Sequence, residues 1–99
     1  MNDENMSETQ QPVLITTTHR GVFFGFLKEN RGDVVVLNEA QNAVYWSSDT
    51  KGVFGLAVTG PHAECRIGPP VPELTLYGVT SVSQCTDEAV KQWQAQPWR

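Results

Sequence analysis

The residues with the greatest chemical potential are two arginines and two neighbouring aromatic side chains. Arg20 and Arg66 each stand beside a glycine-containing segment, which lets a ligand approach the backbone closely. A guanidinium binds phosphate or carboxylate through paired hydrogen bonds, and Tyr45 or Trp46 can stack on a base. The pattern favours an anionic ligand such as a nucleotide. The candidate ligand-binding residues are His19, Arg20, Tyr45, Trp46 and Arg66.

A purely structural interpretation of the same residues is also open. In that interpretation Trp46 belongs to the core. The two arginines then pair with acidic side chains, for which the candidates are Glu39, Glu64 and Glu73.

Motifs for catalysis, metals or cofactors are missing from the chain. It has no Gly-x-Ser-x-Gly element, and Gly52 and Gly55 lack the downstream Lys-Ser/Thr of a phosphate-binding loop. His62, Cys65 and Cys85 could supply three soft ligands, but no fourth ligand is evident. We therefore predict a protein that is not an enzyme, with no catalytic residues, no metal, no cofactor and two free thiols.

Charge and length set the domain organisation. The chain has 99 residues and a net charge of −4, and Asp3, Glu4 and Glu8 fall before the first apolar stretch. We predict a disordered acidic tail over residues 1–12 and one domain over 13–99. The charge argues against general nucleic-acid binding. No apolar run approaches the roughly 20 residues that span a membrane, and the first 12 residues do not resemble a secretory signal, so we expect a cytoplasmic protein.

Short apolar runs separated by turns predict a mainly β domain. Residues 13–18, 22–27 and 34–37 read as strands, the last two joined in a hairpin by a turn at 29–33. Residues 38–42 are polar and read as a turn, and 53–58 fits either a helical turn or a strand. Thr86 followed by Asp87 and Glu88 predicts a helix over about 86–95. The fold class is α+β: a five- or six-stranded antiparallel sheet, or an SH3-like barrel, with one C-terminal helix.

The hairpin is apolar on both faces, which so short a chain has difficulty covering. We therefore predict a homo-oligomer. The residues expected at its interface are Val22, Phe23, Phe24, Phe26 and Val35.

Several short motifs, in order, resemble an uncharacterised family of small proteins from tailed bacteriophages and prophages. They are His19-Arg20-Gly21-Val22-Phe23-Phe24-Gly25, Val44-Tyr45-Trp46-Ser47, Gly55-Leu56-Ala57 with Gly60-Pro61, Cys65-Arg66-Ile67-Gly68, Val79-Thr80-Ser81-Val82 and Thr86 to Trp93. The resemblance spans Val13 to Trp98 and implies expression in the host bacterial cytoplasm, but no mechanism. A strand with Gly25, a turn and a β-branched strand ending near Asn38 is similar to the start of Sm-like and SH3-like barrels.

Three functions fit these features. The first is a non-enzymatic phage protein that binds a host factor, with a role in countering antiphage defence. The second is an oligomeric binder that sequesters a nucleotide immune signal. The third is a minor virion or assembly component.

Overall fold

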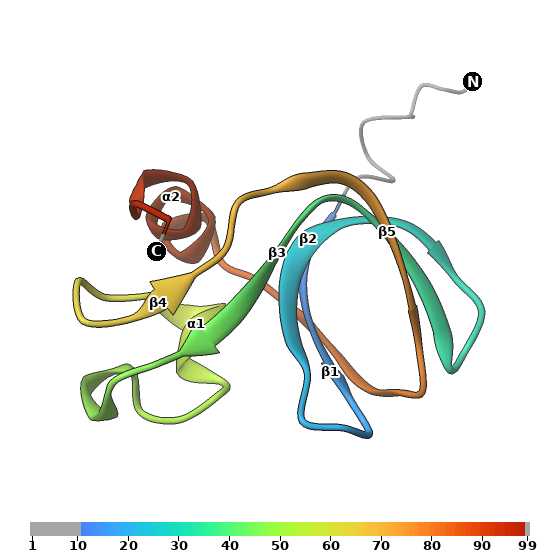
Figure 1. Cartoon of the computed structure of the whole chain (residues 1–99), viewed down its shortest axis with the longest axis horizontal. Coiled ribbons are helices and arrows are strands. Elements are labelled where there is room, and N and C mark those ends of the chain that lie inside the picture. Colours follow the sequence, from blue (N-terminus) through green and yellow to red (C-terminus); the bar gives the residue numbers. More distant parts are fainter. Residues whose placement is uncertain (1–10, 99) are drawn as a thin grey trace.

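A curled antiparallel sheet with two helices at one end makes up residues 11–98, the part of the chain that the computed structural model describes (Figure 1). The predicted fold class, a six-stranded antiparallel sheet with a C-terminal helix, is confirmed. The elements are β1 (Pro12–Thr17), β2 (Val22–Asn30), β3 (Val34–Tyr45), the 3₁₀ helix η2 (Ser48–Thr50), α1 (Gly55–Val58), β4 (Arg66–Ile67), β5 (Val71–Tyr77), β6 (Val79–Gln84) and α2 (Asp87–Ala95).

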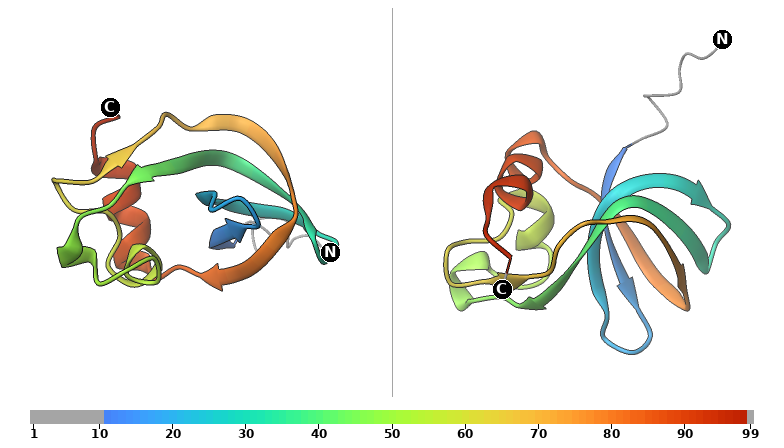
Figure 2. Two further views of the ribbon diagram at one scale, coloured as in Figure 1. Left: turned by 60° about the horizontal axis from the view of Figure 1, so that its bottom comes forward. Right: turned by 45° about the horizontal axis from the view of Figure 1, so that its top comes forward.

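Strands β5 and β6, which pair with opposite sides of the sheet, are consecutive pieces of the chain. The order along the sheet is β4-β3-β2-β1-β6, and β5 pairs with β3 on the side away from β2. Only Gly78 separates β5 from β6, at a φ of 67° that favours glycine. Because one run of chain pairs with β3 and then with β1, the sheet curls into a barrel-like shape (Figure 2).

Strand β3 is much longer than the sequence pattern predicts. The polar segment 38–42, expected to be a turn, is part of the strand, which runs on to Tyr45. Asn38 is paired with Phe26 of β2 and with Glu73 of β5. Pairing with strands on both sides therefore keeps the backbone extended, although the polar side chains of this segment favour a turn. The register shift opposite Phe24 and Phe26 leaves one extra residue in β3. Glu39 lies in this bulge, with a φ of 52°.

Two hydrophobic cores lie on the two faces of the sheet. The inner core contains strand residues alone and fills the curled sheet; its buried members are Val13, Ile15, Val35, Leu37, Ala40 and Leu76. The outer core joins the sheet to the helices; its buried members are Leu14, Val22, Phe24, Leu56, Ala57, Ile67, Ala89 and Trp93. Strand alternation explains the division, because neighbouring residues such as Val13 and Leu14 enter different cores.

The hairpin residues assigned to self-association are covered within one chain. Val22, Phe24 and Val35 are buried, and Phe23 and Phe26 are half-buried against the two cores. The helices cover one face of the hairpin and the curled sheet covers the other. One chain therefore covers most of this apolar surface by itself, and the predicted homo-oligomer stays a prediction.

The ends of the domain follow local signals. Thr86 caps α2, because its Oγ1 accepts a hydrogen bond from the backbone N–H of Ala89 at 3.0 Å. The domain begins earlier than predicted: β1 includes Pro12, and the carbonyl of Gln11 accepts a hydrogen bond from the N–H of Leu27 at 2.8 Å. The rest of the predicted acidic tail, residues 1–10, lies outside the described residues.

Candidate interaction site

Two of the five predicted ligand-binding residues are neighbours. The far end of β3 pairs with the short strand β4, and this pairing sets Tyr45 directly opposite Arg66. Both side chains are exposed, Tyr45 to 53%. The structure therefore places one aromatic ring and one guanidinium side by side on the surface near the helices.

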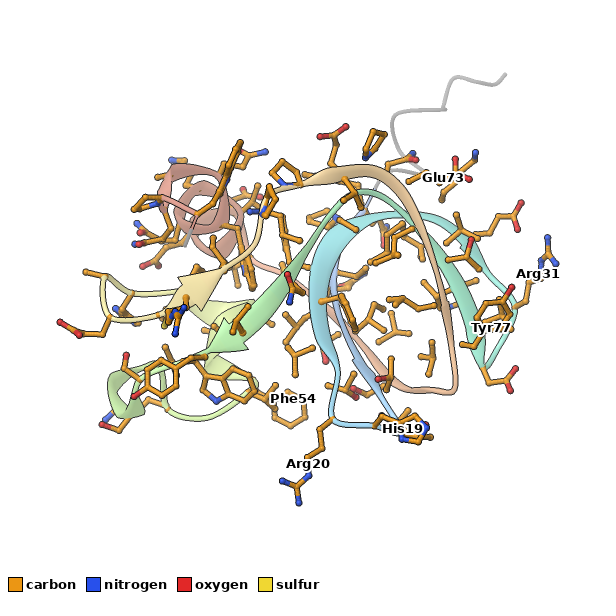
Figure 3. All side chains as sticks on the ribbon, viewed as in Figure 1. His19, Arg20, Arg31, Phe54, Glu73 and Tyr77 are labelled. Carbon is orange, nitrogen blue, oxygen red and sulfur yellow. The ribbon has the colours of Figure 1, made fainter. Side chains whose placement is uncertain are left out.

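The other three predicted residues do not join this pair. His19 and Arg20 lie in the turn between β1 and β2, at the end of the barrel, where Arg20 points away from the body of the protein (Figure 3). That turn and β4 are well separated (Figure 1). Trp46 follows β3, but it is half-buried against the outer core, as the structural interpretation expected.

The proposed acidic partners of the two arginines are not found. Glu73 pairs with Lys28, whose Nζ lies 2.8 Å from the Glu73 carboxylate, and Glu29 pairs with Arg31 at 2.7 Å. Within residues 11–98 neither Arg20 nor Arg66 forms an ion pair. Both guanidinium groups are therefore available to an external anion.

A hollow beside α1 was missed by the sequence analysis. Its volume is about 420 Å³, and its lining residues are Thr50, Lys51, Phe54, Gly55, Val58, Thr59 and His62. Phe54 is 62% exposed and Val58 is 55% exposed, which is high for large apolar side chains. Figure 3 shows Phe54 projecting outward at this end of the molecule. The sequence feature that could have indicated this hollow is the run from Val53 to Val58, which has more apolar residues than one helical turn can bury.

A hydrogen bond and close packing fix the backbone around the hollow. The Thr50 side chain is buried, and its Oγ1 donates a hydrogen bond to the carbonyl of Ser47 at 2.7 Å. Gly55 packs directly against the carbonyl of Thr50, where any side chain would collide with it. Lys51 has a φ of 66° and ends η2. These contacts hold Phe54 and Val58 at the surface rather than in the core.

The polar groups of the hollow are basic or neutral. Lys51 supplies an ammonium, and no acidic residue lines the hollow. The Nε2 of His62 is buried and has no hydrogen-bond partner among the described residues. A buried polar atom of this kind costs free energy until a partner satisfies it. The hollow is thus suited to an apolar group that carries a negative charge.

Both cysteines are free thiols in sheltered positions. Cys65 is buried, with its Sγ 3.3 Å from the backbone nitrogen of His62, which donates to it. Burial raises the pKa of the Cys85 thiol to about 12. In the described part of the chain, no three His, Cys, Asp or Glu side chains gather as they would around a metal ion.

We expect both thiols to resist modification at pH 8, because Cys65 is inaccessible and Cys85 is protonated. A disulfide reagent should react slowly with folded protein and completely in denaturant.

The raised pKa of Cys85 also makes the free energy of unfolding fall as pH rises from about 9 towards about 12, since only the unfolded chain can ionise the thiol in that range. Urea unfolding of wild type and Cys85→Ala at pH 8 and pH 10 checks this. An equal loss of stability in both proteins would contradict it.

The structure thus defines a small β-rich domain with an exposed hollow beside α1 that is lined by apolar and basic side chains. Residues 10–93 match the family model described as "Domain of unknown function (DUF6948)", and the chain belongs to this family. Searches of curated proteins and of solved structures found no match. No helix in the described residues is long and apolar enough to cross a membrane.

Proposed function

We propose that the protein is a non-enzymatic interaction protein that binds a partner protein through the hollow beside α1. The observation that carries the proposal is the exposure of Phe54 and Val58 around a hollow of about 420 Å³. Large apolar side chains exposed together are typical of protein interaction sites. The resemblance to phage proteins supports a host factor as the partner, with binding in the host cytoplasm and a role in countering antiphage defence.

The chemistry of the hollow specifies the occupant. An apolar side chain from the partner would contact Phe54 and Val58, and a neighbouring carboxylate would meet the Lys51 ammonium. Arg66 and Tyr45 are a separate exposed pair at the β3–β4 pairing, and they offer one more cation and one more aromatic ring. The partner segment is therefore expected to be both apolar and acidic.

Phe54→Ala should abolish capture of the host partner without harming the fold. Truncating a central aromatic anchor costs an interface about 2 kcal/mol or more, which weakens binding roughly thirtyfold. Because Phe54 is 62% exposed, the free energy of unfolding should change by no more than about 0.5 kcal/mol. Affinity capture from host lysate with wild-type and variant protein, read by mass spectrometry, measures the first effect.

Tyr77→Ala is the matched control for this experiment. Tyr77 is 72% exposed and lies at the end of the barrel away from the helices (Figure 3). The proposal requires a partner that wild type and Tyr77→Ala both retain and that Phe54→Ala loses. Equal capture by all three proteins, or no reproducible partner at all, would overturn it.

The pairing of Tyr45 with Arg66 favours a second candidate function, the binding of a nucleotide. One ring to stack on a base and one guanidinium free of ion pairs within the described residues are the minimal elements of such a site. A thermal shift with cyclic or ADP-ribose-type nucleotides that is lost in Arg66→Gln would favour this function. The alternative of a virion component predicts the protein in purified particles.

A further inference from the structure

A second cavity lies between the sheet and α2. Its volume is about 160 Å³, and it shares no residue with the hollow beside α1. The lining residues are Phe24, Phe26, Glu39, Gln41, Pro70, Trp93, Gln94 and Trp98. We call it the aromatic cavity, because four of these residues are aromatic.

The floor of the aromatic cavity is rigid. The rings of Phe24 and Trp93 are stacked, with centroids 4.9 Å apart and an interplanar angle of 6°. Both residues are fully buried, and Nε1 of Trp93 donates a hydrogen bond to the carbonyl of Leu56 at 3.0 Å. Phe26 meets Phe24 edge-on at a centroid distance of 5.6 Å. A ligand would therefore find these rings already in place.

The outer wall is an exposed indole. Trp98 follows α2 and lines the aromatic cavity, yet it remains 60% exposed. A tryptophan face that is open to solvent beside a cavity can still accept a contact from a ligand.

The polar groups of the aromatic cavity are the carboxylate of Glu39 and the side-chain amides of Gln41 and Gln94. The bulge in β3 places Glu39 at the cavity, and this carboxylate forms no ion pair with any described residue. Gln41 is only 4% exposed, and its Nε2 donates to the carbonyl of Gly68 at 3.0 Å. This hydrogen bond leaves Oε1 of Gln41 as an acceptor. No lysine, arginine or histidine lines the cavity.

We propose that the aromatic cavity binds an alkylammonium group. Aromatic faces attract a cation through their quadrupole, most strongly when water is excluded, and tryptophan is the best of them. The Glu39 carboxylate adds a negative charge, and the acceptors of Glu39 and Gln41 match the N–H donors of an ammonium. The volume is also suitable, since a cavity of about 150 Å³ holds a molecule the size of benzene.

The test is a titration of the full chain with n-butylammonium and with its neutral counterpart n-butanol. The indole N–H signals of the tryptophans, followed by NMR, report binding. We expect n-butylammonium to shift the Trp98 signal with half-saturation at about 1 mM, and n-butanol to bind at least about tenfold more weakly. Nα-acetyl-lysine methylamide tests where the alkylammonium group comes from. If this probe binds as well, the natural ligand is a lysine side chain. If only butylammonium binds, the natural ligand is a free amine.

Two variants and two controls locate the site. Glu39→Gln removes the charge and Trp98→Ala removes the outer wall, and each should weaken butylammonium binding about fivefold to tenfold. Glu64→Gln and Tyr77→Ala alter an exposed acid and an exposed aromatic ring outside the cavity and should bind as wild type does. Near-UV circular dichroism verifies that each variant is folded. The proposal is overturned by equal binding of butanol, by unchanged binding in both cavity variants, or by no shift at about 10 mM butylammonium.

Discussion

Replacing Trp93 with alanine should destabilise the protein more than any other single truncation of a side chain. Trp93 is fully buried, stacks on Phe24, and joins α2 to α1 through its hydrogen bond to the Leu56 carbonyl. Truncating a buried tryptophan costs about 3–5 kcal/mol, a large share of the roughly 5–15 kcal/mol that stabilises a typical domain. Urea unfolding followed by circular dichroism should show a midpoint well below that of wild type.

A graded series separates the packing of the ring from its hydrogen bond. Trp93→Phe keeps most of the apolar volume but leaves the carbonyl of Leu56 without its donor, which costs about 1–3 kcal/mol. Trp98→Ala is the matched control, because Trp98 is 60% exposed and its loss should cost little. If Trp93→Ala and Trp98→Ala were equally stable, the outer core would not depend on the stacked pair.

Local signals were sufficient for the elements whose stabilising contacts are close in sequence. The apolar strand 22–27 was predicted correctly because its residues favour a strand wherever they are placed. The helix after Thr86 was predicted for the same kind of reason, since its cap and its acidic first turn lie within three residues of one another. In both cases the sequence alone contains the interaction that decides the structure.

Long-range pairing decided the segments that were predicted wrongly. Residues 38–42 contain polar side chains that favour a turn, but strands far away in sequence hold the backbone on both sides. The covering of the hairpin depends in the same way on α2 and on the closure of the sheet by β5 and β6. A hydrophobic pattern cannot show which distant segment supplies the cover, so the sequence does not reveal that α2 and the closing strands cover most of the hairpin.

The candidate sites also depend partly on local sequence and partly on long-range pairing. Tyr45 and Arg66 were chosen for their chemistry, and only the pairing of β3 with β4 makes them neighbours. The aromatic cavity brings together Phe24 and Trp98, which are far apart in the sequence, and no spacing in the sequence indicates that they line one cavity. The hollow beside α1 was not predicted, although the apolar side chains around it lie in the one short run from Val53 to Val58.

Gly55→Ala should disrupt the hollow and destabilise the whole domain. A Cβ at this position would overlap the carbonyl oxygen of Thr50, a backbone atom that cannot move aside without displacing η2 or α1. Overpacking costs typically about 1–3 kcal/mol, and a clash with backbone lies at the upper end or beyond it. Since Leu56 and Ala57 belong to the outer core, a shift of α1 would also loosen the contacts of α1 with Trp93.

Two other glycines separate this clash from the general effect of losing a glycine. Gly32 and Gly52 have φ values of 86° and 88°, and a Cβ at either position would meet no atom within 4 Å. Alanine there should cost about 1–2 kcal/mol through backbone strain alone. Gly55→Ala should exceed both in the loss of unfolding free energy. Under the proposed function, it alone of the three variants should also lose partner binding, because only this substitution changes the shape of the hollow. Equal stability of the three variants would show that η2 and α1 can move apart freely, and the surface around Phe54 would then not be a preformed site.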